Sequence, residues 1–99
     1  MNLSTPNIKQ LIQSFLALET GKETGNFLRD LLTEKEITEF AKRLQAACLL
    51  NDNISYSVIE KKTGLSSTTI ARISKWLNNG MGGYKLIISR LHHTNPSRK

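Results

Sequence analysis

The chain has 99 residues and a mass of 11.1 kDa, which suffices for one domain and excludes a multidomain enzyme. Apolar residues make up 38% and charged residues 22%, a balance typical of a folded domain rather than of a disordered tail. Fourteen basic against eight acidic side chains give a net charge of +6 and an isoelectric point near 9.8, so a polyanion is a more natural partner than a cationic one.

The first third of the chain predicts two amphipathic helices. Pro6 suits the first turn of a helix, with Thr5 before it as the cap. Gly21 predicts the end of this helix, and a shorter apolar segment follows over residues 26–32. The apolar residues of the first helix recur at 3.6-residue spacing: Ile8, Leu11, Ile12, Phe15 and Leu16.

A longer helix is predicted to begin at Thr33. Thr33 and Glu36 form the T-x-x-E pattern of a capping box, and the polar run Asn51–Asp52–Asn53 marks the end of the helix. Its apolar stripe contains Ile37, Phe40, Ala41, Leu44, Ala47 and Cys48.

Six short helices bury surface poorly, since a chain of this size buries only about 60–65% of its unfolded surface. We therefore expect a homodimer in which two chains share these stripes.

Residues 55–79 have the pattern of a helix-turn-helix. Ser55 can cap a short helix that stops at Gly64, where a tight turn requires a left-handed backbone. Ser66 or Ser67 caps the second helix, which ends near Asn79–Gly80. The side chains expected to face the core are Ile59, Leu65, Ile70, Ile73, Trp76 and Leu77.

The end of the chain predicts a hinge, a last helix and a tail. Gly82–Gly83 forms the hinge, and residues 84–91 form the helix. The polar, basic residues 92–99 are expected to be a flexible tail. The expected architecture is all-α, with about six short helices in one domain over residues 1–91.

The positive charge is concentrated in the second half of the chain. Residues 1–54 carry six basic and seven acidic side chains, whereas residues 55–99 carry eight basic side chains and only Glu60, a net charge of +7. Because the helix-turn-helix pattern lies in this half, we predict that the chain binds double-stranded DNA.

The predicted DNA contacts fall into two classes. Short hydroxyl side chains allow a helix to lie deep in the major groove, and an arginine can reach a guanine edge or a phosphate. The residues predicted to read sequence are Ser66, Ser67, Thr68, Thr69 and Arg72. The phosphates are expected to contact Lys61, Lys62, Lys75 and the N-terminus of the second helix.

The stretch from Leu31 to Leu91, about 60 of the 99 residues, resembles the tryptophan repressor family and in particular its uncharacterised bacterial branch. The motifs that carry the resemblance are Ala41–Leu44, Thr63–Gly64 with the hydroxyl residues after it, Thr69–Arg72, and the set Asn78, Gly80, Gly83 and Tyr84. The resemblance implies an intertwined homodimer with one helix-turn-helix per subunit on a palindromic operator, and hence a transcriptional repressor.

The resemblance also implies a candidate effector pocket. In tryptophan-sensing members a threonine and two arginines help to hold the carboxylate of the amino acid, and Thr33, Arg43 and Arg72 stand at those positions. Where sensing members have a glycine and a small hydroxyl residue, this chain has Ile73 and Trp76. Because both are large and apolar, we expect them to fill the pocket and exclude tryptophan. The alternative is that a small effector other than tryptophan binds at Thr33, Arg43 and Arg72.

Other classes of function lack a signal. The sequence has no nucleophile motif, no paired carboxylates, no spaced metal ligands and no phosphate-binding glycine loop, so we expect no catalytic residue, metal or cofactor. No apolar run approaches the roughly 18 residues of a membrane span, and no signal peptide is present, so we expect a cytoplasmic protein with no membrane partner. The alternative is a helix-turn-helix that binds another protein, as in an antitoxin or a polymerase-associated factor.

Overall fold

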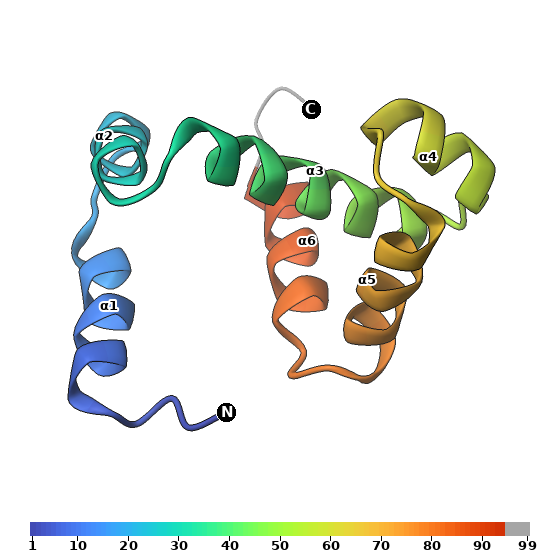
Figure 1. The fold of residues 1–99 in the computed structure, drawn as a ribbon. Coiled ribbons are helices and arrows are strands. Elements are labelled where there is room, and N and C mark those ends of the chain that lie inside the picture. Colours follow the sequence, from blue (N-terminus) through green and yellow to red (C-terminus); the bar gives the residue numbers. More distant parts are fainter. Residues whose placement is uncertain (95–99) are drawn as a thin grey trace. The chain divides into compact units, whose positions relative to one another are not determined.

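The computed structural model describes residues 1–94, which form six helices and no strand (Figure 1). In chain order the helices are α1 (Pro6–Ala17), α2 (Gly21–Leu31), α3 (Glu34–Asn51), α4 (Tyr56–Thr63), α5 (Ser67–Asn79) and α6 (Gly83–Thr94). This confirms the predicted all-α class. Within residues 1–94, no helix combines the length and the apolar character needed to cross a membrane. The chain divides into two compact units, Met1–Ile37 and Thr38–Lys99.

The start of α2 corrects one prediction. Gly21 does not end the first helix but is the first residue of α2, which therefore begins well before residue 26. The Thr20 hydroxyl accepts the Glu23 backbone N–H at 3.1 Å, and the Glu23 carboxylate accepts the Glu19 N–H at 2.9 Å. Thr20 and Glu23 thus form a helix-start signal that outweighs the tendency of glycine to end a helix.

The caps predicted at three other helix starts, those of α3, α1 and α4, have different outcomes. The Thr33 hydroxyl accepts the Glu36 N–H at 3.1 Å, and the Glu36 carboxylate accepts the Thr33 N–H at 2.9 Å, which confirms the predicted capping box. The Thr33 backbone N–H, and after it the Thr33 side chain, lower the pKa of the Glu36 carboxyl. Thr5 and Ser55 occupy the cap positions of α1 and α4, but within residues 1–94 neither makes a side-chain capping hydrogen bond.

The unit Met1–Ile37 leaves its apolar side chains accessible. No residue of α1 or α2 is buried. Phe15 of α1 and Phe27 of α2 pack edge to face, with ring centroids 5.5 Å apart and planes at 75°. Phe15 nevertheless remains 42% exposed, and Leu16 on the same helix is 79% exposed. This unit therefore lacks a buried core within a single chain.

The unit from Thr38 onward contains the buried core, to which α3, α4, α5 and α6 all contribute. Its buried apolar residues are Ala46, Ala47, Ile59, Leu65, Ile70, Ile73, Leu77 and Ile88. This confirms the predicted inward orientation of five residues of the helix-turn-helix, which are Ile59, Leu65, Ile70, Ile73 and Leu77. Cys48 and Tyr84 are partly buried and pack against this core.

Trp76 does not lie on the inner face of α5, so that prediction was wrong. Its side chain is 47% exposed, although the sequence analysis placed it in the core. The buried stripe of α5 consists of Ile70, Ile73 and Leu77, spaced three and four residues apart. At 3.6 residues per turn, position 76 lies about 90° around the helix from the centre of that stripe. Trp76 is therefore on a flank of the helix rather than on its inner face.

The last helix is longer than predicted. Gly82 has a left-handed backbone with φ of 84°, and α6 begins at the next residue and continues beyond Leu91 to Thr94. Residues 92–94 of the predicted tail are therefore helical. The rest of that tail, residues 95–99, lies outside the described residues.

Candidate nucleic-acid interface

The turn between α4 and α5 is fixed by two residues. Gly64 has φ of 76° and ψ of 4°, and its N–H donates to the Glu60 carbonyl at 2.8 Å. Thr63 is buried; its hydroxyl donates to the Ile59 carbonyl at 2.7 Å and accepts the Leu65 N–H at 3.1 Å. The sequence predicted the role of Gly64 in the turn, whereas Thr63 was named only as part of the family motif. Its position directly before the turn glycine was the available signal for its role.

The N-terminus of α5 presents short hydroxyl side chains. Ser66 is the cap, as predicted: its hydroxyl accepts the Thr69 N–H at 3.2 Å and lies 3.1 Å from the Thr69 hydroxyl. Ser67 and Thr68 are exposed, and within residues 1–94 their side chains make no hydrogen bond. The predicted sequence-reading set therefore divides into a bonded pair, Ser66 and Thr69, and side chains that are available to a ligand, Ser67 and Thr68.

The outer face of α5 carries the cations. Thr68, Arg72 and Lys75 are exposed, and their spacing places them on the side of the helix opposite Ile73 and Ile70. Because the buried stripe anchors the helix to the core, these side chains project from a fixed support. Among residues 1–94, neither Arg72 nor Lys75 makes a hydrogen bond or an ion pair.

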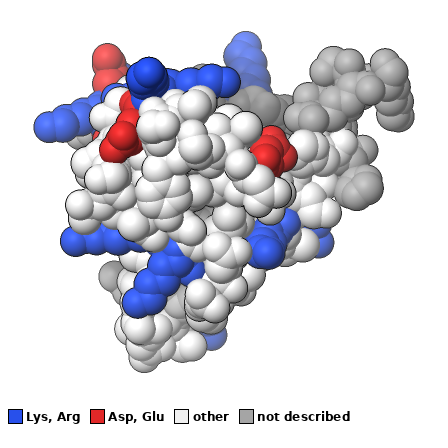
Figure 2. Space-filling view, turned by 90° about the vertical axis from the view of Figure 1, so that its right-hand side faces the viewer, with Lys and Arg blue, Asp and Glu red and all other residues white. Residues whose placement is uncertain are grey.

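The electrostatic environment of the motif is positive. Lys61 and Lys62 lie in the last turn of α4, are exposed, and have no ion-pair partner within the described residues. The half-buried Glu60 is the single acidic side chain of residues 55–94. Figure 2 shows Lys and Arg side chains around the edge of the side that carries α4 and α5, with fewer acidic side chains among them. Unneutralised cations on one surface attract a polyanion.

The residues of the candidate effector pocket have separate structural environments. Thr33 caps α3 and belongs to the N-terminal unit, whereas Arg43 belongs to the C-terminal unit. Arg43 is half-buried and pairs with Glu39 one turn earlier, with a distance of 3.8 Å from Nε to the carboxylate. Arg43 therefore already has an anionic neighbour on its own helix.

The three pocket residues on α5 point in different directions. Ile73 is completely buried in the core, Arg72 is exposed on the outer face, and Trp76 lies on a flank. Ile73 thus occupies core space, while the indole of Trp76 remains accessible to solvent within a single chain.

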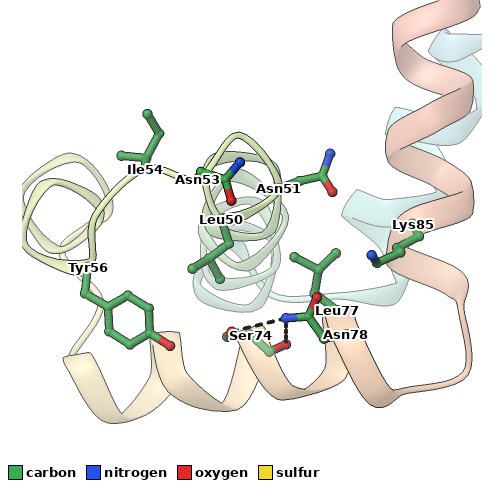
Figure 3. A pocket seen from close by; sticks show the side chains of 9 residues that line it. All are labelled: Leu50, Asn51, Asn53, Ile54, Tyr56, Ser74, Leu77, Asn78 and Lys85. Atoms are coloured by element: carbon green, nitrogen blue, oxygen red, sulfur yellow. Dashed lines mark hydrogen bonds between the residues drawn. The ribbon is translucent and has the colours of Figure 1, made fainter.

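A groove of about 400 Å³ lies elsewhere in the C-terminal unit (Figure 3). It is bounded by the end of α3, the α3–α4 loop, the start of α4, the C-terminal half of α5 and the start of α6. The lining residues are Leu50, Asn51, Asn53, Ile54, Tyr56, Ser74, Leu77, Asn78 and Lys85. None of them belongs to the effector pocket or to the DNA contacts predicted from the sequence. Residues 1–94 contain no group of three or more acidic, His or Cys side chains able to hold a metal ion.

Comparisons with known proteins point to a single family. A family model described as Trp repressor protein matches residues 6–92. The uncharacterised protein YerC of Bacillus subtilis is 37% identical to this chain over 87 residues, which cover 88% of this chain and 84% of that protein.

Two crystal structures have a similar fold. A TrpR-like protein from Eubacterium eligens superposes with a TM-score of 0.87 and 34% identity, covering 94% of this chain and 96% of the other. A proposed Trp repressor from Staphylococcus aureus superposes with a TM-score of 0.85 and 32% identity, covering 91% and 90%.

Proposed function

The chain belongs to the Trp repressor family, and from this premise we propose that it is a sequence-specific DNA-binding transcriptional repressor that acts as a homodimer on a palindromic operator. The main support for the proposal comes from the exposed side chains of the N-terminal half of α5. Exposed Ser67, Thr68 and Arg72 project from a helix anchored in the core, and the charge of Arg72 is not neutralised by any ion pair within residues 1–94.

Base recognition is assigned to the exposed side chains of α5. Arg72 is the residue best suited to discriminate bases, since its planar fork can donate two hydrogen bonds to O6 and N7 of a guanine. Ser67 and Thr68 are short enough to let the helix end approach the base edges. Ser66 and Thr69 act mainly by holding that helix end together, because their hydroxyls bond to one another and to the backbone.

Phosphate contacts position the helix without reading sequence. Lys61 and Lys62 at the end of α4 and Lys75 on α5 are assigned this role, because they are exposed and lack acidic partners among the described residues. The backbone N–H groups of the first turn of α5 add the partial positive charge of a helix N-terminus.

The dimer is supported by the apolar side chains that the single chain leaves exposed. Leu11, Ile12 and Phe15 on α1 and Phe40 on α3 are each at least 40% exposed, although they form the apolar stripes of amphipathic helices. A second copy is the simplest cover for such stripes, and twofold symmetry would place the two α5 helices about 34 Å apart, one turn of DNA.

Tryptophan is not expected to be the corepressor. The methyl groups of Ile73 are fully buried where a sensing member has no side chain, and enlarging a filled site by even one methylene typically costs about 1–3 kcal/mol. DNA affinity should then be independent of added tryptophan. Calorimetric titration of tryptophan, with and without operator DNA, tests this: saturable micromolar binding, or operator affinity that rises with tryptophan, contradicts it.

Trp76 has a role of its own in this proposal. We assign its indole to support α5 in the DNA-binding orientation, as a fixed part of the chain rather than as a bound effector. Trp76→Ser should then weaken DNA binding without changing the response to tryptophan. A thermal-shift screen of amino acids separates this arrangement from a pocket at Thr33, Arg43 and Arg72 that takes another small effector.

The decisive experiment on function begins with selection of bound duplexes from a random pool. The affinity of the selected duplex is then measured by fluorescence anisotropy between 50 and 200 mM salt. If the dimer neutralises about 6–10 phosphates, affinity should fall about 10³–10⁵-fold over that range. Arg72→Ala should lower the affinity for the selected duplex by about 1–3 kcal/mol, while Lys22→Ala, on α2, should not.

Two results would overturn the proposal. A flat salt response would exclude the phosphate contacts, and equal affinity for selected and scrambled duplexes would exclude sequence recognition. Complete indifference to DNA would favour the alternative, a helix-turn-helix that binds another protein.

A further inference from the structure

The groove between the α3–α4 loop, α5 and α6 has a polar wall without acidic side chains. Asn51, Asn53 and Asn78 contribute amides, Tyr56 and Ser74 contribute hydroxyl groups, and Lys85 contributes the one charge of the lining. Within residues 1–94, Lys85 makes no hydrogen bond or ion pair. The lining is therefore rich in hydrogen-bond donors and carries a net positive charge.

The walls of the groove are held in place by hydrogen bonds. On α5, the Asn78 amide nitrogen donates to the Ser74 carbonyl at 2.9 Å and lies 3.5 Å from the Ser74 hydroxyl. In the loop, Asn53 has a left-handed backbone with φ of 61°, and its N–H donates to the Leu50 carbonyl at 3.0 Å. Figure 3 shows Tyr56 and Lys85 directed toward α5 from the two ends of the groove. An extended ligand that lies along the groove would thus meet donors from several elements.

The groove lies beside the outer face of α5. Ser74 and Asn78 are one turn apart on a flank of the helix, about 100° around its axis from the strip formed by Thr68, Arg72 and Lys75. A duplex that lies along this strip brings its sugar-phosphate backbone to the flanks of the helix. Lys, Asn, Ser and Tyr are among the side chains that contact phosphate oxygens in protein–DNA complexes.

We propose that this groove is a phosphate-binding site that receives a phosphodiester of the DNA backbone beside the base-reading strip. Lys85, at one end of the groove, supplies the opposite charge to a phosphate, and the Tyr56 hydroxyl and the Asn53 amide donate hydrogen bonds to oxygens of the same backbone strand further along the groove. The inference rests on the proposed function, and it adds to the expected contacts a second anchor on α6 and on the α3–α4 loop. This anchor would fix the angle at which α5 enters the major groove of the DNA.

The test compares the salt dependence of duplex binding in the full chain and in single variants. Each phosphate contact contributes about 0.9 to the slope of log affinity against log salt, so Lys85→Gln should reduce the slope by about 1.8 for a dimer with two grooves. Lys85→Arg should retain the slope. Lys22→Gln, the same loss of charge on α2, should leave it unchanged. Thermal unfolding verifies that each variant is folded.

Two further variants test the hydrogen bonds rather than the charge. Tyr56→Phe removes one hydroxyl, and Asn53→Gly removes one amide while allowing the left-handed backbone. Both should weaken the selected duplex and its scrambled counterpart by the same factor, since a phosphate contact carries no sequence information. A methylphosphonate scan of the duplex should find one position per half-site at which the wild type loses affinity and Lys85→Gln loses no more.

The outcomes separate this inference from the proposed function. If the wild type shows no salt-dependent duplex binding, both fail. If it shows the steep slope and Lys85→Gln shares it, the groove is not a phosphate site on DNA, while the function stands. A titration with inorganic phosphate at constant ionic strength, followed by amide NMR, adds a third arm: saturable shifts at Tyr56 and Lys85 without a change in DNA slope would assign the groove to a free anion and overturn the inference.

Discussion

The two units of this chain differ in what they do with their apolar side chains. The unit from Thr38 onward buries eight apolar residues, seven from four helices and Leu65 from the turn between α4 and α5, and this core holds α5 with its outer face free. The helices α1 and α2 in the unit Met1–Ile37 bury none, although α1 has a clear apolar stripe. The C-terminal unit therefore supports its surface by itself, whereas the N-terminal unit has the composition of an interface.

The largest effect is expected from a charge placed on the N-terminal unit. Ile12→Asp puts a carboxylate on the exposed stripe of α1, where it is harmless in a monomer but costs about 3–5 kcal/mol when buried unpaired against a second chain. In the wild type the urea midpoint should rise with protein concentration, because folding is coupled to association. Ile12→Asp should remove that dependence.

The matched control for this variant is Gln13→Asp, which places the same charge on the next, polar position of α1. It should keep the concentration dependence of the wild type. If both variants behave alike, the stripe of α1 is not the interface.

The second effect concerns the core of the C-terminal unit. Ile73→Ala removes a completely buried side chain and should lower the free energy of unfolding by about 2–5 kcal/mol. Met81→Ala, at a position 95% exposed between α5 and α6, should change it by less than about 0.5 kcal/mol. Chemical denaturation followed by circular dichroism measures both; similar losses in the two variants would contradict the assigned core.

Two glycine-to-alanine substitutions, one in each unit, should change the free energy of unfolding in opposite directions. A Cβ at Gly64 meets no atom within 4 Å, but the left-handed backbone there makes Gly64→Ala cost about 1–2 kcal/mol. Gly25 lies inside α2 with equal space, so Gly25→Ala should stabilise the chain by about 0.5–1 kcal/mol. Thermal unfolding at one protein concentration compares them; a stabilising Gly64→Ala would refute the assigned turn.

A smaller effect than that of Gly64→Ala is expected at the capping box of α3. Thr33→Ala should destabilise the chain by about 1 kcal/mol through the lost cap. The folded state lowers the pKa of Glu36, so the unfolded state binds a proton more readily. The stabilisation by this carboxylate is therefore present above the ordinary glutamate pKa and is lost as the pH falls through the lowered folded-state pKa. Glu36→Gln should flatten that part of the pH profile of stability.

Periodicity and capping chemistry predicted most of the C-terminal unit. Three- and four-residue spacing identified Ile70, Ile73 and Leu77, and the left-handed requirement of a tight turn identified Gly64. These signals work because local geometry alone decides them. Trp76 was placed wrongly, because its neighbours at 73 and 77 already define the inner face and a large apolar residue on the flank has no local signature.

The start of α2 and the groove beside α5 could not be predicted from the sequence, for different reasons. At Gly21 two local signals compete, and the cap formed by Thr20 and Glu23 prevails over the glycine. The groove brings Asn53, Tyr56 and Lys85 together from three parts of the chain, and no spacing rule connects them. Such a site becomes visible only once the packing of α5 against α6 is known.

The proposed function requires that a second copy of the chain covers the apolar side of the N-terminal unit while the C-terminal unit binds DNA. Sedimentation equilibrium of the full chain at micromolar concentrations, with circular dichroism on the same samples, tests this most directly. We expect a helical dimer, with loss of helicity whenever dilution or Ile12→Asp produces monomer. A monomer that is stable and fully helical at micromolar concentration would contradict it.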